Sequence, residues 1–162
     1  MAKRDITIYS EDNGFGYPGT GPELVESGDT TIESGEPVAH AKGQPYGSAL
    51  ATAKPVVGTD YLSGIAQSES TQTAEADGKC EVLPVAAPCT YLCNPVDPTQ
   101  WDTQAKYDAL VGARVVFTIT DGHYLVGHTD GSTNGLVVEP LDIAATPNKV
   151  RFSLDPALNY KG

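Results

Sequence analysis

Residues 113–128 have the sequence ARVVFTITDGHYLVGH, and they give the clearest indication of the fold class. Two β-rich runs, 113–120 and 123–128, are separated only by Asp121 and Gly122. An Asp-Gly pair between two such runs is typical of a two-residue type I′ turn, because both of its residues tolerate positive φ. The sequence therefore predicts a β-hairpin centred on this turn.

A two-residue turn also sets which residues face each other across this hairpin. Side chains alternate between the two faces of a strand, so the paired residues on one face share one environment. That face carries mainly apolar side chains, and we predict that it belongs to the core. The predicted pairs are Ile119 with Tyr124, Phe117 with Val126, and Val115 with His128.

Short strands are expected on both sides of this hairpin. A second hairpin is predicted to join residues 135–139 to 149–154, with Val150, Phe152 and Leu154 pointing inward. Asp77 and Gly78 form a further turn signal, before a strand that starts at Cys80. Further strands are expected at 5–9, 61–67, 80–85 and 90–93, and extended segments at 30–33 and 37–41.

One helix is expected, beginning at Thr99 as the N-cap residue and ending before Gly112. Trp101 lies on its apolar stripe and is predicted to be a packing anchor. We therefore predict a mainly β protein with one core, in the form of a small β-barrel or β-tulip-like domain with one short helix and an extended N-terminal arm.

The N-terminal part of the chain differs in composition from the rest. Between Asp5 and Ala41 there are eight carboxylates and no Lys or Arg, and the net charge of the whole chain is −11. This stretch has too few large apolar residues to fold alone, so a neighbouring subunit or the body of the fold must supply its contacts. We divide the chain into an extended acidic arm, residues 1–54, and a β-rich domain, residues 55–162.

The acidic charge also bears on the class of partner. A net negative surface repels phosphate backbones and anionic membranes, so we expect no nucleic-acid and no membrane partner. No apolar run approaches the ~20 residues of a bilayer span, and no secretory signal is recognisable, so synthesis in a cytoplasm is expected. The three cysteines, Cys80, Cys89 and Cys93, are expected to be buried free thiols, because their spacing matches no usual zinc pattern.

No pattern in the sequence predicts an active site. His123 and His128 are five residues apart on one predicted strand, so they point to opposite faces and do not share a metal. The glycines at 14, 16, 19 and 21 lack the strand-to-helix context of a phosphate loop. We therefore predict no catalytic, metal-ligating or cofactor-binding residues, and a protein that is not an enzyme.

Two stretches resemble head decoration (capsid cement) proteins of tailed bacteriophages, of the lambda type. The first contains Gly64-Ile65-Ala66, followed by an Ala-Asp-Gly turn at residues 76–78 and a strand. The second runs from the TNGLVVEP sequence of residues 133–140 to residues 150–152. The similarity spans roughly residues 55–154.

This resemblance implies a structural virion protein on the outer capsid surface. Such a protein forms a homotrimer, and its arm lies along major capsid protein subunits and joins neighbouring capsomers, which stabilises the expanded head. The arm contacts that we predict are its sizeable apolar side chains: Ile6, Ile8, Tyr9, Phe15, Tyr17, Leu24, Val25 and Ile32.

Two other classes of function are compatible with parts of the sequence. A carbohydrate-binding or adhesin-like β module would use exposed aromatic rings for stacking. A small trimeric β enzyme such as a nucleotide hydrolase would need a phosphate site, for which the sequence has no pattern. The candidate rings of the carbohydrate-binding alternative are Tyr46, Tyr61, Tyr91, Trp101, Tyr107 and Tyr124.

Overall fold

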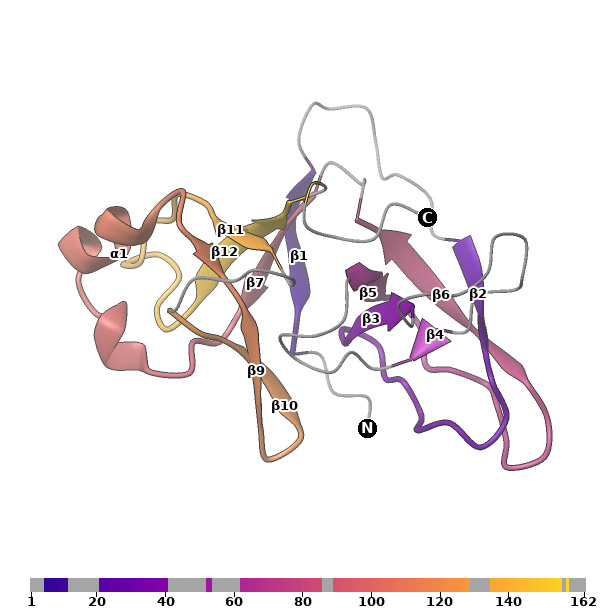
Figure 1. Ribbon diagram of the computed structural model, residues 1–162. Helices are drawn as coiled ribbons and strands as arrows, with labels where there is room; N and C mark the ends of the chain where they lie inside the picture. The colour runs from indigo at the N-terminus through magenta and orange to yellow at the C-terminus, as the bar shows by residue number, and fades with distance from the viewer. Residues whose placement is uncertain are drawn as a thin grey trace.

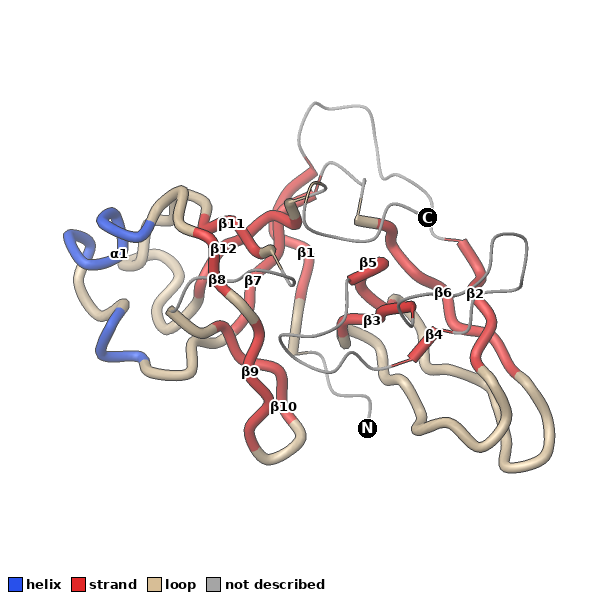
Figure 2. The backbone as a smooth tube through the Cα atoms, in the orientation of Figure 1, coloured by secondary structure: helices blue, strands red, loops and turns tan. Residues whose placement is uncertain are grey.

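The computed structural model describes residues 5–11, 21–40, 52–53, 62–85, 89–128, 135–155 and 157. Within these ranges the protein is mainly β with one short α-helix, which confirms the predicted fold class (Figure 2). The strands form two open antiparallel five-stranded sheets and one separate hairpin, rather than a single closed barrel. The predicted boundary between residues 54 and 55 lies outside the described residues.

The first sheet has the strand order β1-β7-β12-β11-β8. It combines the N-terminal strand with strands from the second half of the chain, and β1 is one of its edges. The predicted pairing of 135–139 with 149–154 is confirmed, because Val138 lies opposite Phe152. Its strands are β1 (Thr7–Glu11), β7 (Cys89–Cys93), β8 (Arg114–Val115), β11 (Leu136–Val138) and β12 (Val150–Leu154).

The second sheet has the order β2-β6-β5-β3-β4 and lies beside the first, with β1 between them in Figure 1. Its edge strands β2 and β4 approach each other, so this sheet curls toward a barrel without a pairing that closes it in the described residues. Its strands are β2 (Gly21–Val25), β3 (Pro37–His40), β4 (Thr52–Ala53), β5 (Leu62–Ala66) and β6 (Gly78–Pro84).

The predicted hairpin is formed by β9 (Phe117–Thr120) and β10 (His123–Val126). Asp121 has φ 51° and Gly122 has φ 77°, as a type I′ turn requires. The predicted pairs of Ile119 with Tyr124 and of Phe117 with Val126 are confirmed.

The third predicted pair of this hairpin is wrong. Val115 pairs with Leu136 in the first sheet instead of with His128, because the chain passes from β8 of that sheet into the hairpin at Val116. The core face was also predicted too far along the hairpin: Phe117 and Tyr124 are buried, but Ile119 is exposed at the tip, beyond the core.

The helix begins later than predicted. A 3₁₀ turn, Pro98–Gln100, is capped by Asp97, and α1 (Gln104–Leu110) is capped by Thr103. Thr99 is therefore not the N-cap residue of the α-helix. Gly112 follows the helix with φ 83°, which agrees with the predicted stop signal.

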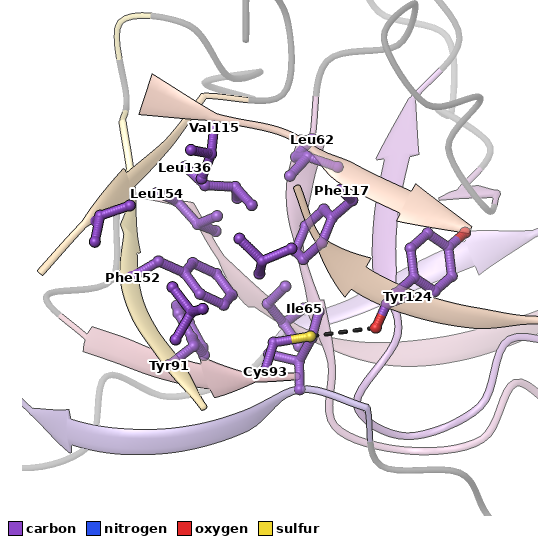
Figure 3. Packing of buried hydrophobic residues seen from close by; sticks show 14 of the residues in the cluster. Leu62, Ile65, Tyr91, Cys93, Val115, Phe117, Tyr124, Leu136, Phe152 and Leu154 are labelled. Atoms are coloured by element: carbon purple, nitrogen blue, oxygen red, sulfur yellow. Dashed lines mark hydrogen bonds between the residues drawn. The ribbon is translucent and has the colours of Figure 1, made fainter. Parts of the chain in front are cut away.

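The main core lies on the inner face of the first sheet. Phe117 packs edge-on against Phe152 and Tyr124, and Tyr91 stacks on Phe152 (Figure 3). Leu62 and Ile65 of β5 enter the same cluster from the second sheet, so the two sheets share this core. Trp101 is buried against Tyr107 of α1, in line with its predicted role as a packing anchor.

The described residues also contain a second buried cluster, which corrects the expectation of a single core. It lies within the second sheet and includes three side chains of the acidic segment. Sequence composition concealed it, because its apolar residues are few and far apart along the chain. Its members are Val25, Ile32, Val38, Ala66, Cys80 and Val82.

Two glycines lie where a side chain has no room: Gly64 at the contact of β5 with β6, and Gly78 against the loop that precedes β6. A Cβ atom at Gly64 would lie 2.1 Å from the carbonyl oxygen of Leu83, and one at Gly78 would lie 2.0 Å from the backbone nitrogen of Gln72. Asp77 and Gly78 do not form the predicted hairpin turn. Gly78 is instead the first residue of β6, and Asp77 Oδ1 accepts a hydrogen bond from the backbone N–H of Ser27.

Candidate interaction surface

The predicted arm contacts occupy different environments in the structure. Ile6, Val25 and Ile32 are buried in the protein's own cores, so they are not available to a partner. Ile8 and Leu24 are partly buried, and Tyr9 is exposed. Phe15 and Tyr17 lie outside the described residues.

The acidic segment obtains its order from the body of the fold, which is one of the two sources considered from the sequence. Strand β1 pairs with β7, β2 with β6, and β3 with β5. The loop between β2 and β3 is tied to the loop between β5 and β6, where Ser70 N–H donates to the carbonyl of Ile32 and Ser70 Oγ accepts from Ile32 N–H. These pairings join strands far apart in sequence, and composition gives no signal for them.

Asp5 fastens the start of the described chain to the hairpin. Its Oδ1 lies 2.8 Å from Nδ1 of His123, and its Oδ2 accepts a hydrogen bond of 3.1 Å from the backbone N–H of Tyr124. The next residue, Ile6, donates its N–H to the carbonyl of Gly35 beside the second sheet. Residues 5 and 6 thus connect the hairpin to the second sheet.

The hairpin β9–β10 projects from the body in Figure 1. Its base is fixed, because Val126 donates its N–H to the carbonyl of Asn94 and accepts from the N–H of Val96. Ile119, near its tip, is 45% exposed, although isoleucine is among the residue types most often buried. The hairpin therefore presents an apolar side chain on a fixed support.

A cavity of about 240 Å³ lies at the junction of the two sheets. It is bounded by the edge strand β1 on one side and by β5 and the turn before β3 on the other. Ser34 donates its hydroxyl to the carbonyl of Gln67, and Gln67 donates its amide to the carbonyl of Ile65, so these polar groups are partnered within the fold. The lining residues are Ile6, Thr7, Ile8, Ser34, Gly35, Ile65, Gln67 and Tyr91.

Buried titratable side chains occur in both cores. Burial raises the pKa of the Cys80 thiol to about 11 and that of Cys93 to about 12. Burial also raises the pKa of Tyr124, and the carboxylates of Glu36 and Asp5 add to this effect. These groups are neutral at neutral pH, as expected of side chains that stabilise a core and not of activated nucleophiles.

All three cysteines are buried and none forms a disulfide, as predicted. Cys93 donates its thiol to the carbonyl of Tyr124, a contact drawn in Figure 3. Within the described ranges, no group of three or more His, Cys, Asp or Glu side chains could hold a metal ion. His123 faces Asp5, while His128 is exposed.

The rings proposed for carbohydrate stacking lie mostly in the core. Tyr91, Trp101, Tyr107 and Tyr124 are all buried and cannot serve as binding platforms. Tyr46 and Tyr61 lie outside the described residues. The hydroxyl of Tyr107 has a structural role, because it donates to the carbonyl of Glu139 and accepts from the N–H of Arg151.

No protein-family model, curated protein or solved structure matches this chain. Among the described residues, α1 is far too short to cross a bilayer, and no other helix has the length and apolar character to do so. Within the described residues the protein is therefore mainly β, and only a few of its large apolar side chains are exposed. They are Tyr9, Val96, Val111 and Ile119.

Proposed function

We propose that the protein is a structural, non-catalytic virion component that binds the outer surface of a phage capsid as a homotrimer and cements neighbouring major capsid protein capsomers. The observation that carries this proposal is the hairpin β9–β10, which holds Ile119 exposed at the tip of a fixed projection. An apolar side chain on a hairpin with a fixed base suits insertion between subunits of a protein partner, since little order must be gained on binding.

Charge supports placement on the outside of a capsid. The described residues 21–40 and 62–85 carry nine carboxylates and a single lysine, Lys79. Such a surface would be repelled by packaged DNA inside the shell. It also keeps a protein present in many copies soluble before assembly.

The sequence resemblance gains a physical basis from the two glycines of its motifs. Gly64 of the Gly-Ile-Ala step and Gly78 of the Ala-Asp-Gly stretch are both positions without space for a Cβ atom. The approach of β5 to β6 thus requires Gly64, and the approach of the loop before β6 to the start of that strand requires Gly78. These packing constraints are compatible with the resemblance, and both a shared fold and a shared function are part of the proposal.

The role of the N-terminal segment is revised in this proposal. Ile6, Val25 and Ile32 stabilise the body, and Tyr9, with the partly exposed Ile8 and Leu24, stays a candidate capsid contact. The body, and the hairpin in particular, replaces a free arm as the main contact. A trimer would present three such hairpins, so weak single contacts add up to firm attachment.

Co-sedimentation with expanded capsids that lack the protein tests this function. The wild-type protein and a Val111→Asp control should sediment with the capsids, whereas Ile119→Asp should bind at least about tenfold more weakly, because a charge would replace the buried apolar contact. Light scattering should show a trimer. Absence of wild-type binding, or equal binding by both variants, would contradict the proposal.

A further inference from the structure

A shallow groove of about 480 Å³ opens between the end of β1, the helix α1 and the segment that follows β11. It is wide open to solvent, so a ligand in it would be only partly enclosed. It combines one exposed aromatic ring with charged and amide side chains from three separate parts of the chain. The residues of this Tyr9 groove are Tyr9, Gln104, Asp108, Pro140, Leu141, Asp142 and Arg151.

A β-bulge turns the ring of Tyr9 outward. Ile8 lies opposite Tyr91 and Ser10 lies opposite Thr90, so Tyr9 is the extra residue of β1 and has no partner in the ladder. Its side chain is 45% exposed. Bulges of this kind redirect side chains at the edges of sheets, where β1 lies.

Arg151 of β12 holds this ring in place from one side. Its Cζ lies 4.7 Å from the ring centroid of Tyr9, within the range of a cation–π contact. The guanidinium is itself fixed, because Nε donates to Thr90 Oγ1 and Nη1 donates to the carbonyl of Pro140, both at 3.1 Å. The ring is thus ordered in advance, which lowers the entropy lost when a ligand stacks on its exposed face.

The rim of the groove offers fixed hydrogen-bond acceptors. Gln104 Nε2 donates 2.7 Å to Asp108 Oδ1, and the N–H of Ala144 donates 3.0 Å to Asp142 Oδ1. These contacts orient both carboxylates through one oxygen each. In the part of the chain that the structure describes, the Oδ2 atoms of Asp108 and Asp142 accept no hydrogen bond, and both side chains are exposed.

The charges of the groove select among ligand classes. Two carboxylates disfavour phosphate, sulfate and carboxylate ligands. The guanidinium already stacked on Tyr9 disfavours a second cation against the same ring. A neutral ligand can meet both requirements if its apolar C–H face stacks on the ring of Tyr9 and its hydroxyls donate hydrogen bonds to the two carboxylates.

We propose that the Tyr9 groove binds a neutral carbohydrate, with one pyranose ring stacked on the exposed face of Tyr9 and its hydroxyls donating to Asp108 and Asp142. The aromatic residues singled out from the sequence for such a role are buried or undescribed, and the ring that the fold offers is a different one. This inference goes beyond capsid binding and does not depend on it.

The test is NMR titration of the ¹⁵N-labelled full chain with neutral glucose-, galactose- and N-acetylglucosamine-based oligosaccharides. We expect shifts confined to the groove for at least one sugar. Tyr9→Ala should weaken binding about tenfold or more, because stacking is lost, and Tyr9→Phe should retain it. Asp108→Asn should also weaken binding, and Ile119→Ser, with an equally exposed apolar side chain elsewhere, should not.

Several results would overturn this assignment. One is the absence of any shift at about 10 mM of every oligosaccharide, a concentration that would occupy most of a site with a dissociation constant of about 1 mM. Another is binding that is indifferent to Tyr9→Ala and Asp108→Asn, which would place the sugar elsewhere. A third is a preference of the groove for a lysine-rich peptide over all neutral sugars. None of these results alters co-sedimentation with capsids, so the two proposals fail separately.

Discussion

Replacement of Gly64 by alanine tests the closeness of β5 and β6, on which the second sheet depends. A Cβ atom at this position would lie 2.1 Å from the carbonyl oxygen of Leu83 and 2.7 Å from Cγ1 of Val82. The first obstacle is backbone and cannot rotate away. The strands must therefore separate locally, which strains the pairing of Gly64 with Pro84 and of Ile65 with Leu83.

Overpacking of a well-packed site costs about 1–3 kcal/mol, and a rigid obstacle puts Gly64→Ala at or above the upper end of this range. Total stabilities of globular proteins are about 5–15 kcal/mol, so the loss is a substantial fraction. For a chain of this size, 3 kcal/mol corresponds to a fall in Tm of about 6–12 °C.

The matched control is Gly21→Ala in β2, where a Cβ atom would meet no heavy atom within 4 Å. We expect it to change the free energy of unfolding by less than about 0.5 kcal/mol. Urea unfolding can be followed by far-ultraviolet circular dichroism together with the fluorescence of Trp101, the single tryptophan. If Gly64→Ala and Gly21→Ala unfold at the same urea concentration, the close approach of β5 and β6 is refuted.

Three further predictions concern the hairpin, the helix and the buried thiols. Asp5→Ala should lower the free energy of unfolding by about 1–2 kcal/mol and speed amide exchange in β10, because the N–H of Tyr124 loses its acceptor. The control Asp102→Ala removes only a half-exposed ion pair with Lys106 and should change this free energy by less than about 0.5 kcal/mol. Equal effects of the two variants would contradict the role of Asp5. Tyr107→Phe should lower the free energy of unfolding, measured by thermal unfolding, by about 1–3 kcal/mol, because the N–H of Arg151 loses the Tyr107 hydroxyl as acceptor. The control Tyr9→Phe changes an exposed tyrosine and should leave stability unchanged. Unchanged stability of Tyr107→Phe would show that its hydroxyl is dispensable. The thiols of Cys80 and Cys93 should resist a disulfide reagent at about pH 8 in the folded protein. Burial raises their pKa values from 9.0 to about 11 and about 12, so the unfolded chain binds fewer protons than the folded one above pH 9. The stability that these thiols contribute is therefore complete below pH 9 and is lost as the pH rises through 11 to 12. Urea unfolding measured across this pH range without a decline in stability would contradict this prediction.

Local signals in the sequence predicted the parts of the fold that depend on neighbouring residues. Asp121 and Gly122 define the turn and therefore the register of β9 and β10, because a two-residue turn admits one pairing. The alternation of Val150, Phe152 and Leu154 likewise identified the buried face of β12. Both predictions rest on short-range geometry.

Long-range pairings escaped prediction. Strand β1 lies beside β7, more than eighty residues later, and no sequence pattern specifies this partner. The helix start was misplaced at Thr99 because the sequence did not separate two elements: Asp97 caps a 3₁₀ turn that contains Thr99, and Thr103 caps the α-helix that follows. The groove at Tyr9 depends on a bulge and on Arg151 from another strand, so a single-sequence pattern does not reveal it.

Hydrogen exchange of the isolated protein and of the protein bound to expanded capsids shows whether the N-terminal segment is ordered by its own fold and whether the hairpin is the capsid contact. Peptides covering residues 21–40 should be protected already in the isolated protein, because β2 and β3 belong to its own sheet. The hairpin tip around Ile119 should gain protection only on the capsid. Rapid exchange throughout 21–40 in the isolated protein, together with an unchanged tip in the bound state, would contradict the account.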